Sequence, residues 1–288
     1  MQRVCGRITN ALVRQRKCEH SQSLQPRRCL SAAVPHTADG AKKVALVTGA
    51  SGCLGKAIAL DLGKQGCNVI VHYNSNADAA QEVVDEIVAA GGAASKLHAD
   101  LRDQQQVAAM FKQAAALFPQ DSLQICVNNA GAIRDSLALK MKPEDWREVL
   151  ELNLTAAFFC SQAAFAHMMR QRSGRIVNIS SIVGQMGNPG QANYAAAKGG
   201  MIAMTRSLAK EFAKRNVCVN VVCPGYIEST MTASLPNLQE LVQSIPLGRL
   251  GTPDEVAGLV RFLALDPAAA YITGHSFNVD GGVAIGSS

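Results

Sequence analysis

Short runs rich in β-branched residues alternate with helical stretches from Lys43 onward. The predicted strands are residues 44–48, 69–73, 96–100, 123–127, 175–179, 217–223 and 275–279. The predicted helices are residues 56–65, 79–90, 105–118, 143–171 and 194–215. Alternation of this kind indicates a parallel sheet with helices packed on both faces. We therefore predict a single α/β domain built on a Rossmann-type, doubly wound parallel sheet of about seven strands.

The front of the chain carries most of its positive charge. Residues 1–43 hold nine Lys and Arg but only two acidic residues, so the net charge of this segment is +7. The net charge of the remaining 245 residues is therefore −1. The segment lacks the apolar block of about 7 to 15 residues that a secretory signal requires. We therefore expect residues 1–40 to be an organelle transit peptide and residues 41–288 to form the domain. A disordered basic tail that binds an acidic partner is the alternative.

The front segment leaves the organelle open. Arg28-Cys29-Leu30-Ser31 resembles a mitochondrial processing site. Plastid transit peptides of algae have a similar composition, so both the mitochondrion and the plastid fit this segment.

The composition of the rest of the chain excludes several classes of protein. A near-neutral body does not match the basic footprint of a nucleic-acid-binding protein. The most apolar stretch, residues 154–169, is shorter than the roughly 18 residues of a membrane-spanning helix and contains polar residues. The nine cysteines form no C-x-x-C pairs, which is typical of a reducing compartment, and the six histidines are dispersed. We expect no nucleic acid, membrane or metal partner.

A glycine-rich turn follows the first predicted strand and precedes the first predicted helix. It reads Thr48-Gly49-Ala50-Ser51-Gly52-Cys53-Leu54-Gly55. Glycines at such a turn let backbone N–H groups approach a pyrophosphate at a helix N-terminus, where the helix dipole favours an anion. Glycine turns occur in many folds, so the flanking strand and helix carry the argument here.

Polar motifs follow other predicted strands. They are Asn128-Asn129-Ala130-Gly131, Ser181, Tyr194-Ala195-Ala196-Ala197-Lys198 and Pro224-Gly225. Because the carboxyl ends of parallel strands lie at one edge of a sheet, we expect these motifs to lie near the glycine turn. Together they resemble the motifs of the short-chain dehydrogenase/reductase family, over essentially the whole span 43–285.

Tyr194 and Lys198 are four residues apart on a predicted helix, so their side chains share a face. An ammonium group beside a phenol favours the phenolate, and we expect the pKa of Tyr194 to lie below its ordinary value of about 10. Such a tyrosine is a usable acid near neutral pH. Taken singly, the residues also fit structural roles, as a surface Tyr–Lys pair or as a serine in a turn.

The family resemblance implies a catalytic role for four residues: Asn153, Ser181, Tyr194 and Lys198. Tyr194 would donate a proton to a carbonyl oxygen, and Ser181 would hydrogen-bond and polarise that oxygen. Lys198 would also hold the nicotinamide ribose. Asn153 would position a water that resupplies protons to Lys198, although an asparagine here also fits a cap at a helix break.

The end of the second strand favours NADPH over NADH as the cofactor. NAD-specific sheets usually place an acidic residue there for the ribose 2′-OH, and residues 71–76 contain no carboxylate. The arginine that relatives often carry at the position of Gly52, to meet the 2′-phosphate, is absent. The expected cofactor-binding residues are Gly49, Ala50, Ser51, Gly52, Leu54, Gly55, Asn74, Asp100, Leu101, Asn129, Ala130, Gly131, Tyr194, Lys198, Pro224, Gly225 and Ile227. Among them, Asp100 and Leu101 would lie at the adenine.

Cys53 departs from the family pattern, because it stands where the family has its middle glycine. If the backbone there requires a positive φ, a cysteine costs about 1 kcal/mol or more and crowds the pyrophosphate. A tolerated small residue is one outcome. In a second outcome, Gly52 adopts the turn conformation instead and the cofactor binds with reduced affinity. The remaining two are a subunit that binds cofactor poorly and serves as a scaffold, and a redox-active thiol at a helix N-terminus.

Further runs resemble one branch of the family, the 3-oxoacyl-acyl-carrier-protein reductases of type II fatty-acid synthesis. These runs are residues 134–137, 168–172, 187–194, 219–225 and 271–274. Residues 219–225, 263–265 and 280–285 are most similar to plant plastid members, which favours the chloroplast stroma over the mitochondrial matrix.

The branch implies NADPH-dependent reduction of 3-oxoacyl-acyl-carrier-protein to the 3-hydroxyacyl form. It also implies a homotetramer in which helices 143–171 and 194–215 pack across an interface. The acidic acyl carrier protein would dock at Arg172 and Arg215 near the pocket mouth, although both arginines also suit helix ends. The alternatives are a reductase of another alcohol or ketone, such as a steroid or quinone, and the scaffold subunit that Cys53 suggests.

Overall fold

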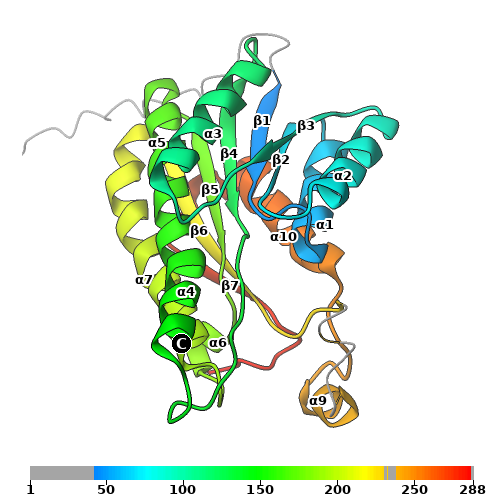
Figure 1. Ribbon diagram of the computed structural model, residues 1–288. Coiled ribbons are helices and arrows are strands. Elements are labelled where there is room, and N and C mark those ends of the chain that lie inside the picture. Colours follow the sequence, from blue (N-terminus) through cyan, green and yellow to red (C-terminus); the bar gives the residue numbers. More distant parts are fainter. Residues whose placement is uncertain (1–41, 230–231, 233–237, 287–288) are drawn as a thin grey trace, which may run out of the picture. The chain divides into compact units, whose positions relative to one another are not determined.

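The computed structural model describes residues 42–229, 232 and 238–286. Seven parallel strands form one sheet in the order β3-β2-β1-β4-β5-β6-β7, which confirms the predicted doubly wound fold (Figure 1). The strands are β1 Lys43–Val47, β2 Asn68–Tyr73, β3 Ala93–His98, β4 Ser122–Asn128, β5 Gly174–Ile179, β6 Val217–Pro224 and β7 Ser276–Val279. The expected transit peptide, residues 1–40, lies outside the described residues.

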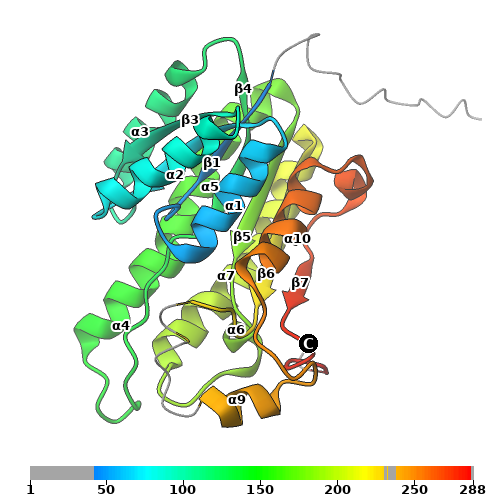
Figure 2. The same ribbon diagram turned by 90° about the vertical axis from the view of Figure 1, so that its right-hand side faces the viewer.

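The helices cover both faces of the sheet. They are α1 Cys53–Lys64, α2 Ala77–Ala89, α3 Gln104–Leu117, α4 Pro143–Leu150, α5 Ala156–Gln171, α6 Val183–Met186, α7 Ala192–Phe212, α9 Leu238–Ser244 and α10 Pro253–Leu265. Helices α1, α2 and α10 enclose one apolar core, and α3, α5 and α7 enclose the other. The two groups lie on opposite sides of the sheet in Figures 1 and 2, and α4, α6 and α9 lie beyond the carboxyl ends of the strands.

The central strands are largely apolar and buried because both faces of the sheet are covered. All eight residues of β6 are buried, as are residues 44–47 of β1. The edge strand β3 is only partly buried, and its observed bounds lie about three residues before the predicted 96–100. Its sequence, Ala93-Ala94-Ser95-Lys96-Leu97-His98, has little of the β-branched composition that marks the inner strands.

The predicted helix 143–171 is interrupted. A π-helical turn, Glu151–Thr155, separates α4 from α5. The prediction also contains no element between residues 223 and 275, where the structure has α10. Pro253 at its first turn and a capping box between Thr252 and Glu255 start this helix.

By length and composition, the stretch Pro143–Gln171 is apolar enough to cross a membrane, since an 18-residue window within it has a mean hydropathy of 1.3. One side of this stretch belongs to the domain core. Ala156, Cys160, Ala164 and Met168 of α5 are fully buried against the sheet. The apolar composition therefore serves the packing of α5 on β4 and β5.

Candidate active site

A cavity of about 290 Å³ opens at the carboxyl edge of the sheet. It is lined by residues from the β1 turn and from the ends of β4, β5 and β6. The predicted site residues that line it are Leu54, Asn129, Gly131, Asn153, Ser181, Tyr194, Lys198, Pro224, Gly225 and Ile227. The structure therefore brings the four expected catalytic residues together with much of the expected cofactor site.

The end of β5 fixes the position of α7. Lys198 Nζ donates a hydrogen bond to the carbonyl oxygen of Ile179 at 2.8 Å, and Ser180 Oγ donates to the carbonyl oxygen of Lys198 at 2.8 Å. Lys198 is almost fully buried, and its Nζ lies 5.5 Å from the centre of the Tyr194 ring. The expected shared face of Tyr194 and Lys198 is confirmed.

The predicted shift in the pKa of Tyr194 is wrong. Burial raises the pKa of Tyr194 to about 12, while the Ser181 hydroxyl lowers it and the negative charge of Asp135 raises it further. Burial also lowers the pKa of Lys198 to about 8. Desolvation disfavours the charged form of each group, and at Tyr194 it outweighs the Ser181 hydroxyl, which favours the phenolate. In this structure Tyr194 is therefore firmly protonated at neutral pH.

Asn153 sits inside the π-helical turn and lies beside Gly131. Its Nδ2 donates to the carbonyl oxygens of Ala132 (2.8 Å) and Val149 (2.9 Å). Its Oδ1 is buried and accepts no hydrogen bond from the described residues. A β-carbon at Gly131 would contact both Asn153 Oδ1 and Lys198 Nζ, so these two atoms border the same small space. A buried, unpaired amide oxygen calls for a water molecule, which fits the expected role of Asn153.

The glycine turn after β1 has the geometry of an anion site. Helix α1 begins at Cys53, and its N-cap residue, Gly52, makes no side-chain capping bond. The first N–H groups of α1 therefore remain available to an anion. A β-carbon at Gly55 would collide with the Gly49 carbonyl oxygen and would lie 2.6 Å from Asn129 Nδ2. These features fit a dinucleotide pyrophosphate.

The other expected cofactor residues lie along the same edge but outside this cavity. Gly49, Ala50, Ser51, Gly52 and Gly55 form the β1 turn, Ala130 follows β4, Asn74 follows β2, and Asp100 and Leu101 follow β3. The side chains of Ala50 and Leu101 belong to the apolar cores, so only their backbones can face a ligand. The Asp100 carboxylate is paired with the Arg102 guanidinium, which lowers its pKa.

Cys53 does not carry the backbone strain that its position in the motif suggested. It is the first residue of α1, and its φ is not positive. Gly49 is the turn residue with positive φ, at +62°. The Cys53 thiol is exposed, lines the cavity, and lies 3.7 Å from the carbonyl oxygen of Glu228.

The prediction that Arg172 and Arg215 lie near the pocket mouth is wrong for a single chain. Arg172 precedes β5 and Arg215 precedes β6, so both lie at the amino edge of the sheet. Ser181 lies beyond the carboxyl end of β5. The five residue steps along β5 alone separate the two edges by about 17 Å.

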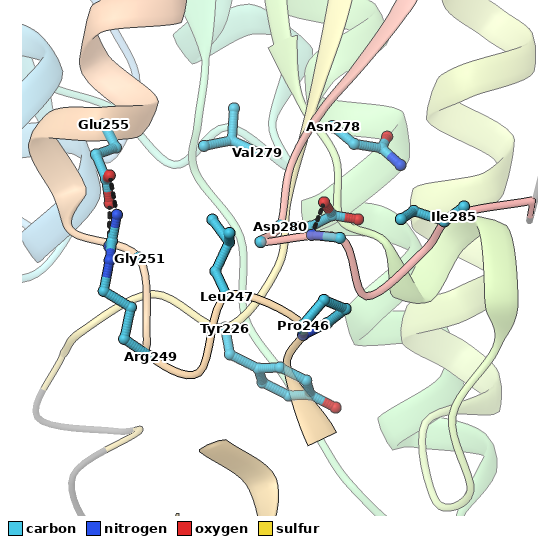
Figure 3. A pocket seen from close by; sticks show the side chains of 12 residues that line it. Tyr226, Pro246, Leu247, Arg249, Gly251, Glu255, Asn278, Val279, Asp280 and Ile285 are labelled. Carbon is cyan, nitrogen blue, oxygen red and sulfur yellow. Dashed lines mark hydrogen bonds and ion pairs between the residues drawn. The ribbon is translucent and has the colours of Figure 1, made fainter. Parts of the chain in front are cut away.

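Two larger cavities lie away from the catalytic side chains. One, of about 430 Å³, lies between the loop after β6 and the C-terminal segment, where Leu247, Pro246 and Ile285 give it an apolar lining (Figure 3). The other, of about 700 Å³, borders α7 and β7. Within residues 42–229, 232 and 238–286, no cluster of three or more His, Cys, Asp or Glu could hold a metal ion.

Sequence reasoning missed two residues of this edge. Asp135, in the loop after β4, accepts hydrogen bonds from Gln191 Nε2 at 3.1 and 3.0 Å and raises the pKa of Tyr194. His72 lies inside β2 and hydrogen-bonds the glycine turn. Asp135 falls in the run 134–137 and His72 in residues 71–76, but neither has a predicted role. The signal that could have indicated His72 is its position in the second strand, next to the strand that precedes the glycine turn.

The fold and this edge together define an α/β oxidoreductase whose glycine turn and Tyr–Lys pair suit a nicotinamide dinucleotide. The family model described as enoyl-(acyl carrier protein) reductase matches residues 49–284. The chain belongs to the short-chain dehydrogenase/reductase family, whose members use a nicotinamide cofactor.

Several curated proteins are similar to the chain over most of its length. A 3-oxoacyl-[acyl-carrier-protein] reductase of Synechocystis is 52% identical over 241 residues, covering 84% of this chain and 96% of the relative. The 3-oxoacyl-[acyl-carrier-protein] reductase FabG of Staphylococcus aureus is 46% identical over 243 residues, covering 84% and 98%. The protein of that name from Staphylococcus epidermidis is 44% identical over the same lengths.

Proposed function

We propose that this protein reduces the 3-oxo group of an acyl chain carried on acyl carrier protein, with NADPH as the hydride donor. The observation that carries the proposal is the cavity that gathers Asn153, Ser181, Tyr194 and Lys198 beside the glycine turn. The names of relatives that are 52% and 46% identical support the same reaction.

The hydroxyl groups suit a carbonyl substrate. A bound nicotinamide supplies a hydride to the carbonyl carbon, and the carbonyl oxygen then needs a proton. Tyr194 holds a proton because burial raises its pKa to about 12, and Ser181 offers a second hydroxyl to the same oxygen. Donors aimed at an oxygen that gains negative charge lower the barrier.

Lys198 and Asn153 form the proton supply behind Tyr194. The pKa of Lys198, lowered to about 8 by burial, lets its ammonium give up a proton near physiological pH. A water held by Asn153 Oδ1 would lie beside Lys198 Nζ, since both atoms border Gly131. These residues would return a proton to Tyr194 after each turnover.

The two names among the comparisons differ in the bond reduced. The family model is described as an enoyl reductase, which implies a C=C bond, whereas the relatives are named for a 3-oxo group. Two hydroxyl donors favour the 3-oxo group, because its reduction sends the proton to the oxygen of the carbon that takes the hydride, whereas reduction of a C=C bond sends the proton to the other carbon.

NADPH is the proposed form of the cofactor. Its support is the lack of a carboxylate at residues 74–76, directly after β2, where an NAD-specific site binds the ribose 2′-OH. We expect NADPH to bind at least tenfold more tightly than NADH in calorimetry, and equal affinities would contradict this choice.

The partners follow from the same branch of the family. We propose a homotetramer that packs α5 and α7 against a second copy, and an acyl carrier protein that docks at Arg172 and Arg215. The apolar, partly exposed Phe158 on α5 supports an interface there. Because both arginines lie at the amino edge, a carrier docked on one chain would deliver its acyl group to the carboxyl edge of another.

The chloroplast stroma is the proposed location, with the mitochondrial matrix as the alternative. The basic, acid-poor composition of residues 1–40 supports an organelle transit peptide. A fluorescent protein fused to residues 1–40 should enter plastids of plant or algal cells, and the same fusion without these residues should stay in the cytosol. Accumulation in mitochondria would select the alternative.

The decisive assay measures NADPH oxidation with acetoacetyl-acyl-carrier-protein as substrate. We expect turnover in the protein that starts at Ala41, and a loss of at least a hundredfold in kcat in Tyr194→Phe. Turnover of steroid or quinone ketones in preference to the carrier-bound substrate would favour another reductase of this family. NADPH binding too weak to detect would favour the scaffold subunit.

A further inference from the structure

We infer that His72 is a positioning residue of the dinucleotide site: its neutral imidazole holds the glycine turn after β1 and ties this turn to the backbone that follows β3. The inference rests on the proposed use of a nicotinamide dinucleotide and names a residue outside the family motifs.

The hydrogen bonds of the imidazole ring carry the inference. The N–H of Gly49 donates to His72 Nδ1 at 2.9 Å, so Nδ1 has no proton of its own. Nε2 therefore carries the ring proton and donates it to the carbonyl oxygen of Ala99 at 3.0 Å. Both ring nitrogens are used, and they require a single tautomer of the neutral ring.

The backbone of His72 holds the same turn. Its carbonyl oxygen accepts a hydrogen bond from the N–H of Ala50 at 2.9 Å. Gly49 has a positive φ of 62°, and a β-carbon at this position would lie 3.0 Å from Ala130 Cα. His72 thus constrains the glycine turn from β2, while Asn129 constrains it from β4 through bonds to the carbonyl oxygens of Thr48 and Gly49.

The ring lies where a dinucleotide passes from its pyrophosphate to its adenine. Gly49 belongs to the expected pyrophosphate turn, and Ala99 directly precedes Asp100, the expected adenine contact. The side chain of His72 is 2% exposed, so a ligand does not touch it and its action is indirect. A rigid turn lowers the entropy lost when the dinucleotide binds.

The surroundings keep the ring neutral. Burial lowers the pKa of His72 from 6.5 to about 4, and the hydrogen bond to Ala99 opposes part of that shift. The ionisable groups that act on the ring come from β3 and the segment after it: His98 lowers its pKa, and Asp100, itself paired with Arg102, raises it. Asp103 caps α3 on the same side of the sheet, and the turn 48–52 contributes no ionisable side chain.

Two substitutions separate the hydrogen bond to Gly49 from simple packing. In His72→Asn, Oδ1 occupies nearly the position of Nδ1 and can accept from Gly49, whereas His72→Leu has similar bulk and no acceptor. We expect His72→Leu to weaken NADPH binding about tenfold in calorimetry at pH 7.5. His72→Asn should stay within threefold of the unmodified protein, and kcat at saturating NADPH should change less than twofold in both.

A control and a direct spectroscopic test complete the experiment. His98→Asn removes the neighbouring, exposed histidine that makes no hydrogen bond to the turn, and it should leave the NADPH affinity within twofold. Nitrogen-15 NMR of the unmodified protein at pH 7 should show His72 as a neutral ring with its proton on Nε2. This measurement does not depend on whether any variant folds.

Several results would overturn the inference: a His72 ring charged at pH 7 or protonated on Nδ1, unchanged NADPH affinity in His72→Leu, an equal loss in His72→Asn, or a similar loss in His98→Asn. If instead the unmodified protein fails to bind NADPH at all, the proposed function fails. The tautomer measured by NMR then still tests the hydrogen bonds of His72 separately.

Discussion

Lys198 shows how one side chain can support chemistry while weakening the fold. Its ammonium is almost fully buried, and its partner in the structure is the carbonyl oxygen of Ile179. The pKa of Lys198 is about 8 in the folded protein against an ordinary value of 10.5. The unfolded chain therefore holds more protons between these two pH values, and stability rises as the pH increases through that window.

We predict that Lys198→Met stabilises the protein at pH 7 while it abolishes reduction. Removing the buried charge should raise the free energy of unfolding by about 1–2 kcal/mol, after the loss of the hydrogen bond to Ile179 is subtracted. The gain should shrink as the pH rises from about 8 to 10.5, because Lys198 loses its proton in the folded state first and is neutral in both states only above that range. Urea unfolding at pH 7 and pH 10.5 measures the effect, and Lys210→Met, exposed on the same helix, serves as the control. A destabilised Lys198→Met at pH 7 would contradict the prediction.

The motif position of Cys53 suggests that replacing it by glycine would relieve strain and improve cofactor binding, but the structure leads to the opposite expectation. The residue has ordinary helical backbone at the start of α1, so a glycine there relieves no strain. We predict that Cys53→Gly changes the affinity for NADPH less than threefold and the free energy of unfolding by less than about 1 kcal/mol. Calorimetry with Cys53→Ser as a polar, similarly sized control tests this. A tenfold tighter complex in Cys53→Gly would show that the side chain does crowd the cofactor.

At the scale of elements, the junction of β1 and α1 depends on close backbone packing. Two glycines of this turn have the same side chain but different surroundings. A β-carbon at Gly55 would collide with the Gly49 carbonyl oxygen and lie 2.9 Å from Ala50 Cα, whereas one at Gly52 would meet only the Gly49 carbonyl oxygen at 3.5 Å. The packing thus tolerates a methyl group at one position and excludes it at the other.

We predict that Gly55→Ala lowers NADPH affinity more than tenfold and also lowers the melting temperature, because the turn must shift to admit the methyl group. Gly52→Ala has a negative φ of −89° and should keep the melting temperature within about 2 °C, since an alanine adopts that backbone without strain. Thermal unfolding and calorimetry distinguish the two variants. Equal behaviour of both would mean that the turn adapts freely.

The π-helical turn between α4 and α5 is a second element whose irregularity serves the site. It turns Asn153 inward, so that Nδ2 binds two backbone carbonyls and Oδ1 faces the space beside Gly131. Irregular helical turns of this kind recur at functional sites. The two interpretations of Asn153, as a residue at a helix break and as a residue of the proton supply, are therefore compatible.

At the scale of the whole molecule, the sheet separates the proposed docking residues from the chemistry. Arg172 and Arg215 lie at the amino edge, and Ser181 lies at the carboxyl edge. We predict that Arg172→Glu combined with Arg215→Glu raises KM for acetoacetyl-acyl-carrier-protein about tenfold, because the reversed charges repel an acidic carrier. The KM for a short acetoacetyl thioester without the carrier should not change.

Mixed oligomers test whether docking and catalysis occur on different chains. A chain with both arginines reversed keeps a complete cavity, and a Tyr194→Phe chain keeps both arginines. Mixing the two should restore low-KM turnover of the carrier-bound substrate, and added salt should weaken it. A mixture with no low-KM turnover would show that docking and catalysis occur on the same chain. An unchanged KM in the protein with both arginines reversed would show that these arginines do not bind the carrier.

The sequence alone determined the class of fold and the members of the site. The alternation of short strands and helices predicts a parallel sheet with helices on both faces, whereas the order of the strands came from the structure. The motifs at the strand ends identified Ser181, Tyr194, Lys198 and the glycine turn, since parallel strands deliver their carboxyl ends to one edge. Local composition sufficed for these conclusions.

Only the tertiary structure decided what surrounds those residues. The sequence placed Lys198 beside Tyr194 and suggested a lowered phenol pKa, but burial of both groups reverses that shift. It showed His72 as one polar residue in an apolar strand, and contacts with β1 and β3 make it a support of the glycine turn. The reason is physical: desolvation and hydrogen bonding depend on atoms that are distant in the chain, and no local pattern encodes them.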